Sequence, residues 1–347
     1  MQLNELWFLI VGFLFIGYFV LDGFDFGVGI SLPFLGKDDV DRRVLINTIG
    51  PVWDLNETWV LVAGASLFAA FPEWYATLFS GFYLPLLLIL LALIARGVAF
   101  EYRGKGHTIG ANEARWKSNF DWMIFIGSAL PALLWGVAFA NIIQGVPLEK
   151  VGPSTVYTGN LFTLLNPYGL LGGLVTLTLF WTHGLLFITL KTEGDIKDRA
   201  RALATKVGIV CTVLAASFLV WTLVTHIGGE LFVLQLVLTG IAAVTLIAGL
   251  VLNLLKREGL AFTLVVFTII NAVGALFAAL FPNVLPSSID GGAASLTIEN
   301  ARSSDYTLGV MTWVAAIMIP LVLTYQGWTY WVFRKRVSRK SIPATAH

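Results

Sequence analysis

Long apolar runs recur along this chain, and they restrict it to a fold that lies within a lipid bilayer. A transmembrane helix needs about 20 consecutive apolar residues, and such runs fill most of the 347 residues. Only 12% of the residues are charged, whereas soluble domains carry about a quarter. Because so few charges cannot cover an aqueous surface, we predict an all-α integral membrane protein.

Nine segments are candidates for membrane-spanning helices. They cover residues 6–33, 56–71, 76–100, 120–145, 161–190, 204–228, 231–254, 260–281 and 307–333. The second is the shortest, and the polar residues 50–54 before it leave open a short span or a re-entrant segment. Nine spans suggest two four-helix bundles and one extra helix. We therefore expect a single membrane domain with one bundle in residues 1–145, a second in 160–281, a peripheral helix at 307–333 and a basic cytoplasmic tail at 334–347.

Basic residues are divided unequally between the two sides of these segments. When the nine segments alternate in direction, all but two of the 22 Lys and Arg residues fall on one side, and the exceptions are Lys150 and Arg302. Cytoplasmic loops carry an excess of Lys and Arg, so we predict an outside N-terminus and a cytoplasmic C-terminus. Leaving out the second segment would move the later loops to the wrong side, so we retain nine.

Several classes of site are excluded by the composition and by missing motifs. The one cysteine, Cys211, lies inside an apolar run, which excludes a disulfide framework, a Cys-type zinc site and an iron–sulfur cluster within this chain. No P-loop, nucleotide fingerprint or metal motif is present. The Gly-x-Gly at residues 27–29 is expected to serve helix packing. The first 33 residues lack the basic region and cleavage site of a secretory signal, so we expect a retained anchor.

His183 is the one histidine within an apolar segment. It could be a haem ligand, a proton relay or a hydrogen-bonded contact between helices, and we favour the contact. A site for two haems would need several axial His or Met ligands. Met123, Met311 and Met318 have no spacing that argues for ligation. We therefore expect no haem, no other cofactor and no metal to be held by this chain.

Asp22 and Asp25 lie three residues apart in the first segment, on one face of a helix. A charge at membrane depth costs about 2.5–3.5 kcal/mol on insertion scales and is therefore a functional candidate. Two carboxylates this close repel one another, which would let one of them carry a proton. The alternative is that both lie at the cytoplasmic end of the helix and bond to backbone or to Arg42 and Arg43.

A second polar group opens the second segment. Residues 54–57 match a capping box, in which Asp54 accepts from a backbone N–H and Glu57 reaches back to the start of the helix. Trp53 and Trp59 flank this group. A polar cluster between aromatic residues favours the mouth of a buried proton path over a helix cap alone.

Other polar residues are expected to have structural roles near the cytoplasmic ends of the third and fourth segments. Arg96 could pair with one of the carboxylates, or it could extend to lipid phosphates, and we favour the lipid. Glu101 lies near the same end, and Asp121 opens the fourth segment. We group Arg96, Glu101 and His183 as structural polar residues at membrane depth.

Six motifs resemble, in order, those of subunit II of cytochrome bd-type quinol oxidases. They are DGFDFGVG at 22–29, NTIGPVWDLNE at 47–57, FAAFP at 68–72, GNLFTLLNPYGLL at 159–171, LPSS at 285–288 and MTWVA at 311–315. The likeness runs from about residue 5 to 333. One departure is Leu55, where the family usually has Gly, and the added side chain could narrow a channel beside Asp54.

The resemblance implies a complex of the bacterial plasma membrane that oxidises quinol and reduces dioxygen to water. Two b-type haems and haem d would be held by the larger partner, subunit I. Subunit II would hold no haem, assist assembly and supply a cytoplasmic proton path. The acidic residues of that path match Asp22, Asp25 and Asp54, to which we add Glu57, and Trp59 matches a tryptophan on an oxygen route.

Further partners follow from the same resemblance. Some family members hold a structural quinone in this subunit, and small single-helix accessory subunits are possible partners beside lipid. No nucleic-acid partner is expected. One rival function is a proton-coupled secondary transporter, although the acids cluster near one surface rather than at the midplane. The other is a structural scaffold in which the aspartates are inert.

Overall fold

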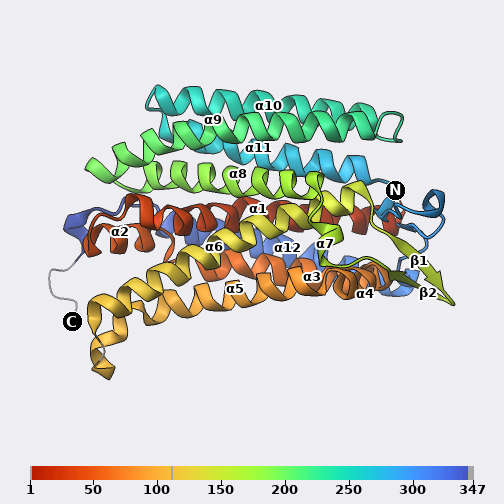
Figure 1. Ribbon diagram of the computed structural model, residues 1–347, viewed down its shortest axis with the longest axis horizontal. Coiled ribbons are helices and arrows are strands. Elements are labelled where there is room, and N and C mark those ends of the chain that lie inside the picture. The colour runs from red at the N-terminus through yellow and green to blue at the C-terminus, as the bar shows by residue number, and fades with distance from the viewer. Residues whose placement is uncertain (1, 111, 343–347) are drawn as a thin grey trace.

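Long helices run side by side along the length of the molecule (Figure 1). The computed structural model describes residues 2–110 and 112–342. Eight helices of this described part are long and apolar enough to cross a membrane, which confirms an all-α integral membrane protein. They are α1 (Leu3–Leu35), α5 (Tyr83–Tyr102), α6 (Glu113–Gln144), α8 (Pro167–Lys191), α9 (Gly194–Thr225), α10 (Phe232–Leu254), α11 (Glu258–Leu280) and α12 (Asp305–Val332).

The second predicted segment forms a shorter helix, α3 (Trp53–Ala70), which packs against α1 and α12. Its 18 residues give a length of about 27 Å at 1.5 Å per residue. Polar residues in its first turns lower its hydropathy and keep α3 outside the set of eight apolar helices. The count of nine spans therefore remains a prediction, and it depends on α3.

Two predicted segments are each divided into two helices. The third contains α4 (Pro72–Gly81) and α5, and the fifth contains α7 (Leu161–Leu164) and α8. The break in the third segment falls at Phe82, between α4 and α5, and the break in the fifth falls just before Pro167, which opens α8 after an Asn166 cap. A proline suits the first position of a helix because that residue needs no N–H donor there. Hydropathy alone misses these breaks because both sides of each break are apolar.

Short elements lie in the connections, and the sequence did not predict them. The helical ones are α2 (Asp39–Ile49), η1 (Arg103–Ile109), η2 (Asp290–Gly292) and η3 (Arg339–Ser341). Two antiparallel pairs are formed by β1 (Leu148–Val151) with β2 (Ser154–Tyr157), and by β3 (Asn283–Leu285) with β4 (Leu296–Thr297). Residue 148 lies opposite 157 in the first pair.

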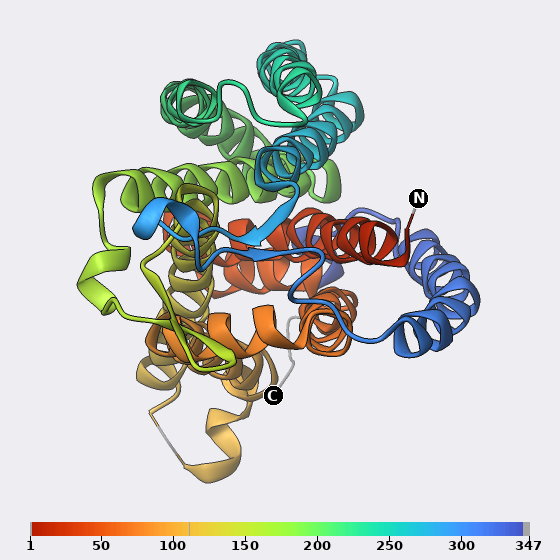
Figure 2. The ribbon, with the colours of Figure 1, turned by 90° about the vertical axis from the view of Figure 1, so that its right-hand side faces the viewer.

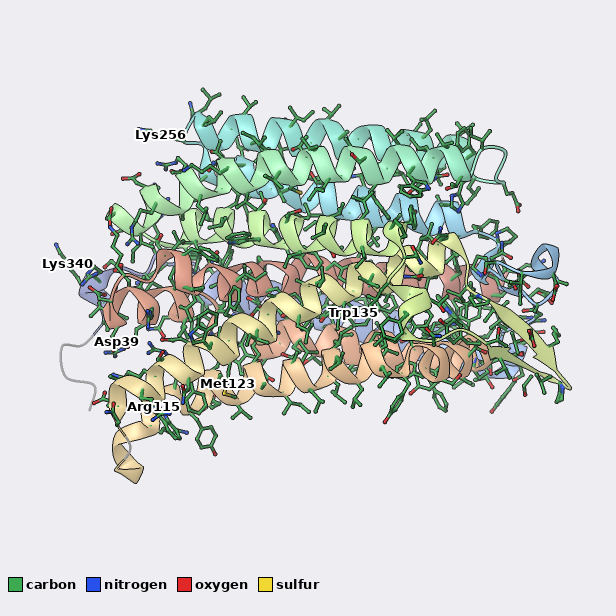
Figure 3. All side chains as sticks on the ribbon, in the orientation of Figure 1. Asp39, Arg115, Met123, Trp135, Lys256 and Lys340 are labelled. Atoms are coloured by element: carbon green, nitrogen blue, oxygen red, sulfur yellow. The ribbon has the colours of Figure 1, made fainter. Side chains whose placement is uncertain are left out.

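The two ends of the molecule differ in charge. Figure 3 shows Asp39, Arg115, Lys256 and Lys340 at one end, and Figure 1 shows the N-terminus at the other. We call the first the basic end; it comprises α2, the α5–α6 and α10–α11 connections, and tail residues 334–342. The predicted alternation of nine segments places the basic loops together in this way. That the basic end faces the cytoplasm remains a prediction, and residues 343–347 of the predicted tail lie outside the described residues.

The helix α1 occupies the centre of the molecule and contacts α3, α6, α8, α11 and α12. Viewed along the helices, α9 to α11 lie on one side of α1 and α8, α5 lies on the other, and α12 lies at the edge (Figure 2). Glycines allow α1 and α8 to approach closely: a Cβ on Gly184 would lie 2.4 Å from Gly27 Cα. This confirms the packing role predicted for residues 27–29. The division into two bundles remains a prediction.

Candidate functional site

A buried arginine joins two acidic residues from different helices. Arg96 Nη2, on α5, donates to Asp22 Oδ1 on α1 at 2.7 Å and to Glu57 Oε2 on α3 at 2.9 Å. The side chains of Arg96 and Asp22 are completely buried, whereas that of Glu57 is 22% exposed. The opposite charges offset one another in a region where an unpaired charge would be strongly unfavourable. Glu57 is the member of this group that reaches the surface.

The predicted extension of Arg96 to lipid phosphates is wrong. Its side chain points into the bundle, and its guanidinium lies 4.4 Å from the centre of the Phe26 ring on α1. Hydropathy gives no direction for a side chain on an apolar helix. The buried carboxylates on α1 supply the physical reason for this inward direction, because they need a counter-charge that lipid cannot provide.

Asp25, one turn after Asp22, belongs to a second set of hydrogen bonds. Asn56 Nδ2 on α3 donates to Asp25 Oδ2 at 2.7 Å. Asn56 Oδ1 accepts from Gln326 Nε2 at 2.9 Å and from the Tyr330 hydroxyl at 2.7 Å, both on α12. Asn56 is completely buried. It therefore links the central helix, the short helix α3 and the peripheral helix.

Gln326 and Tyr330 were missed by the sequence reasoning. They lie four residues apart on an apolar helix, and this polar pair was the signal that could have indicated a buried contact. Each is about 270 residues from Asn56 in the chain. No local pattern predicts a partner at that separation.

The alternative in which Asp54 caps the helix is wrong. Val52 occupies the cap position of α3, and no side chain caps the helix. Glu57 turns to Arg96 instead of back to the first turn. Asp54 is exposed, and its carboxylate has no hydrogen bond or ion pair within the described part of the chain. The structure thus brings Asp22, Asp25 and Glu57 together and leaves Asp54 outside, on the surface one turn away.

Trp59 lies between α1 and α12 and borders an apolar cavity. Its indole Nε1 donates to Gln326 Oε1 at 3.4 Å, and its ring packs so closely on α1 that a Cβ at Gly17 would lie 2.2 Å away. The cavity has a volume of 230 Å³ and lies between α1, α3 and α12. Leu55, the residue that departs from the family pattern, also lines it.

His183 forms a contact between helices. Its Nε2 is hydrogen-bonded to the Val20 carbonyl of α1 at 3.0 Å, and its ring stacks on Phe262 of α11 with 4.8 Å between the ring centres. These contacts fit the predicted hydrogen-bonded contact between helices, and the other ring nitrogen, Nδ1, is buried without a hydrogen-bond partner among the described residues. Glu101 is exposed near the end of α5, without a hydrogen bond or ion pair among residues 2–110 and 112–342. It is outside the buried network.

Ion pairs form a separate layer at the basic end. Asp121 accepts from Arg42 at 2.8 Å and from Arg103 at 2.6 Å. The alternative in which Arg42 or Arg43 pairs with the aspartates of α1 is therefore wrong for Arg42, whose carboxylate partner is Asp121. Arg43 forms no ion pair within the described residues. This layer neutralises charges where the helices end.

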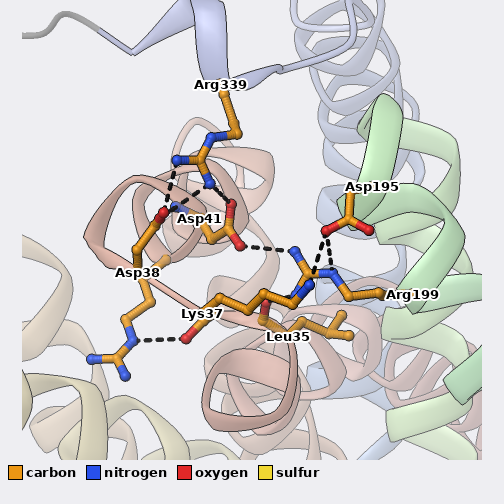
Figure 4. Close-up of polar contacts among 9 residues, drawn as sticks. Leu35, Lys37, Asp38, Asp41, Asp195, Arg199 and Arg339 are labelled. Atoms are coloured by element: carbon orange, nitrogen blue, oxygen red, sulfur yellow. Dashed lines mark hydrogen bonds and ion pairs between the residues drawn. The ribbon is translucent and has the colours of Figure 1, made fainter.

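The tail residue Arg339 belongs to the same layer. It donates to Asp38 Oδ2 at 2.7 Å and also to Asp41 (Figure 4). Arg199 on α9 reaches Asp41 from another direction at 2.8 Å. The Arg339 guanidinium lowers the pKa of the Asp38 carboxyl below its usual value. The tail is thereby tied to α2.

A metal site needs several His, Cys, Asp or Glu side chains around one point. In the described ranges, no group of three or more His, Cys, Asp and Glu side chains is arranged to hold a metal ion. The carboxylates of the buried network already bond to a guanidinium and an amide. These bonds use one oxygen of each aspartate, whereas Asp22 Oδ2 and Asp25 Oδ1 have no hydrogen-bond partner among the described residues.

Known proteins resemble this chain over almost its whole length. The family model described as cytochrome bd terminal oxidase subunit II matches residues 3–333. Cytochrome bd ubiquinol oxidase subunit 2 of Bacillus subtilis is 41% identical over 340 residues, covering 98% of each chain. Cytochrome bd-I ubiquinol oxidase subunit 2 of Escherichia coli is 39% identical over 376 residues, covering 99% of this chain and 98% of that one.

A solved structure supports the same fold. A chain of the bd oxidase from Geobacillus thermodenitrificans has a TM-score of 0.74 at 16% identity, and the match covers 96% of this chain and 99% of that chain. With eight apolar helices, these findings indicate a multi-pass protein of the bacterial inner membrane. The chain belongs to the cytochrome bd terminal oxidase subunit II family and is thus a subunit of a quinol:oxygen oxidoreductase complex.

Proposed function

We propose that this chain is the haem-free subunit of its oxidase and that it conducts protons from the basic end toward the partner subunit. One observation carries the proposal: Asp22 and Asp25 are completely buried, yet they connect through Arg96 and Asn56 to Glu57 and α12. Buried ionisable groups in a membrane protein commonly belong to proton relays. Because the chain belongs to the oxidase family, the alternative of a proton-coupled secondary transporter is not pursued further.

Glu57 is suited to be the entrance of the path. Its partly exposed carboxylate shares the Arg96 guanidinium with Asp22, so the two acids lie on either side of one cation. A guanidinium does not release its proton in proteins. Arg96 would therefore hold and orient the carboxylates, while the acids and intervening water carry the proton. Asp54, exposed one turn before Glu57, would collect protons at the surface.

The buried aspartates are suited to be the inner carriers. Asp22 Oδ2 and Asp25 Oδ1 are buried and have no hydrogen-bond partner in the described part of the protein. A free carboxylate oxygen can accept a proton without first breaking a hydrogen bond. Reduction of dioxygen to water consumes protons, and taking them from one side of the membrane would make turnover charge-separating.

The haems would be held entirely by the larger subunit, two of b type and one of d type. This division is supported by the scarcity of axial ligands, because His183 is the one histidine within an apolar segment and a site for two haems would need several His or Met ligands. This chain would contribute to assembly through its exposed apolar helices. A structural quinone and small accessory subunits remain further proposals for the complex.

Trp59 would border a route for oxygen. The 230 Å³ cavity beside it is lined mainly by apolar residues of three helices. Dioxygen is apolar and enters such spaces readily. Leu55 lies in the wall of this cavity, so the substitution of Leu for the family's usual Gly would narrow the oxygen route and not the bonded acid network.

Quinol oxidase turnover of the purified complex tests the proton path. We expect Asp25→Asn to slow oxygen consumption by on the order of 100-fold, the usual scale for losing a proton-transferring group, with unchanged haem spectra. Glu57→Gln should also slow it. Asp54→Asn should have a smaller effect, because its carboxylate is exposed and outside the buried network.

Glu101→Gln is the matched control, since it removes an exposed acid near the same end without touching the network. Parent-like turnover in this control would show that surface charge alone has little effect. Parent-like turnover in Asp25→Asn would support the scaffold alternative and refute the path.

A further inference from the structure

A cavity near the basic end is separate from the acid network except at Tyr330, which lines the cavity and bonds to Asn56 of the network. Its volume is 490 Å³, and residues of α1, α2, the α2–α3 turn, α8, α11, α12 and the tail line it. α11 packs on α1 and α8, whereas α12 packs on α1 and α3. The cavity therefore lies between α11 and α12, with α1 as its floor. Phe24, Phe187 and Phe262 form much of its apolar wall.

Three cations, Lys191, Arg334 and Arg336, lie at the mouth of this cavity. Lys191 donates to the carbonyl oxygens of Phe333 and Lys335, and Arg334 donates to the Trp331 carbonyl at 2.6 Å. Within residues 2–110 and 112–342, none of the three cations forms an ion pair with a carboxylate. Backbone carbonyls alone do not neutralise this charge.

Other arginines at the same end are neutralised. Arg42, Arg103, Arg199 and Arg339 each pair with at least one aspartate. The cavity mouth therefore gathers three cations without an ion pair, and at the same end Arg43 and Lys340 also lack one among the described residues. Trp331, under the Arg334 guanidinium at 4.5 Å, is a residue type that favours the headgroup level of a membrane.

We propose that this cavity binds an anionic phospholipid, with an acyl chain against the three phenylalanines and the phosphate at Lys191, Arg334 and Arg336. The inference goes beyond the proton path and rests only on the basic end facing the cytoplasmic leaflet. Basic pockets between helices on that side attract acidic headgroups. A neutral amphiphile would fill the apolar part and leave the three cations without a counter-charge.

The lipid would stabilise one edge of the acid network. Tyr330 lines the cavity, and its hydroxyl donates to Asn56, which in turn bonds to Asp25. A bound acyl chain would keep bulk water from this side of Tyr330. It would also hold the end of α12 against α1 and α8, where Lys191 donates hydrogen bonds to the carbonyl oxygens of Phe333 and Lys335.

Binding of phosphatidylglycerol to the purified, delipidated complex tests the proposal, with phosphatidylcholine as the neutral comparison. We expect Arg334→Gln with Arg336→Gln to weaken phosphatidylglycerol binding roughly 30-fold, about fivefold for each cation lost near the surface. The matched control, Lys335→Gln with Lys340→Gln, removes the same charge from neighbouring tail residues that do not line the cavity. It should bind as the parent does.

A second variant tests the apolar part. Val266→Trp fills the cavity wall without changing any charge, and it should also abolish tight binding. Equal loss in the Lys335 and Lys340 control would mean attraction by surface charge alone and would overturn the site. Binding that survives Val266→Trp, or equal affinity for phosphatidylcholine, would do the same. Oxidase turnover is not the readout, so these outcomes are independent of the proton path.

Discussion

Arg96 is held between two acids at a depth where neither charge could exist alone. Its bonds to Asp22 and Glu57 come from α5 to α1 and α3, so one residue ties three helices together. Replacing a buried ion pair with apolar groups is often tolerated, whereas removing one partner leaves an unpaired charge. Whether a mutation of Arg96 or of one of its acids destabilises the protein therefore depends on whether the partner residue is changed too.

Arg96→Gln should destabilise the complex by about 3–5 kcal/mol, the usual effect of breaking a buried ion pair. The thermal unfolding midpoint of the purified complex measures this loss. Adding Asp22→Asn to Arg96→Gln removes the unpaired charge and should recover part of it. A double variant no more stable than Arg96→Gln would argue against the pairing.

Part of this residue-level site was predictable from the sequence. Asp22 and Asp25 were identified because a carboxylate in an apolar run is unusual, and Glu57 was identified from the polar cluster between Trp53 and Trp59. The direction of Arg96 was not predictable, because its partners lie 74 and 39 residues away. The capping pattern at residues 54–57 was misleading, since it does not fix where the helix begins, whereas the proton-path role of Asp54 stays a prediction.

Helix contacts in this molecule depend on small residues where α1 passes its neighbours. A Cβ on Gly184 of α8 would lie 2.3 Å from the carbonyl carbon of Gly27. Such an approach brings the backbones of two helices together without polar side chains. It also fixes α1, and hence Asp22 and Asp25, relative to α8.

Gly184→Ala should destabilise the protein by about 1–3 kcal/mol through overpacking, measured by thermal unfolding. Gly64→Ala on α3 is the matched control, because nothing lies within 4 Å of its added Cβ. That change should be neutral or stabilising, since Ala is the better helix former. Equal losses in both variants would contradict the close approach of α1 and α8.

The tail is a second element whose attachment can be tested, this time by pH. Arg339 lowers the pKa of Asp38 from its ordinary value of 3.8. A lowered carboxyl pKa gives stability that is present above the ordinary value and is lost as the pH falls through the lowered one. We expect amide exchange in residues 336–342, taken relative to the intrinsic rate at each pH, to be slow at neutral pH and faster below about pH 4.

Arg339→Gln should make that exchange fast at neutral pH as well. Lys340→Gln is the control, because Lys340 is exposed and has no ion pair in the described ranges. A tail that stays protected in Arg339→Gln would mean that the backbone bond from Val337 to the Lys191 carbonyl, at 2.7 Å, is sufficient to hold it.

Most helices were predictable, whereas their interruptions and the short elements were not. Apolar runs located α10 and α11 within a few residues. They also located α9, but this helix begins at Gly194, well before the predicted start at residue 204, because its first turns are polar. The amphipathic α2 was missed because it is short and polar, and it is held by ion pairs to Arg199 and Arg339. Such tertiary contacts produce no periodic pattern of apolar residues in the sequence.

At the scale of the whole molecule, the two ends of the helical body differ in charge, and labelled charged residues such as Arg115 and Lys256 lie at one end (Figure 3). The acid network lies between α1, α3, α5 and α12, and its partly exposed member is Glu57. If the basic end faces the cytoplasm, protons enter from that side. The orientation and the crossing by α3 are therefore premises of the proposed function.

Cysteine labelling in intact cells tests the orientation. Lys256→Cys at the basic end should react only with membrane-permeant reagents, and Ser154→Cys in the β1–β2 hairpin should also react with impermeant ones. Native Cys211 is buried, so it should give little background. Labelling of both sites from the same side would contradict nine alternating spans.

The most direct test of the central claim is proton uptake by the reduced complex when it is mixed with oxygen, in a variant carrying Asp22→Asn and Asp25→Asn. The proposed path predicts that haem oxidation begins at the parent rate while proton uptake slows by on the order of 100-fold. Proton uptake at the parent rate, with the haems intact, would show that protons reach the oxygen-reducing site by another way.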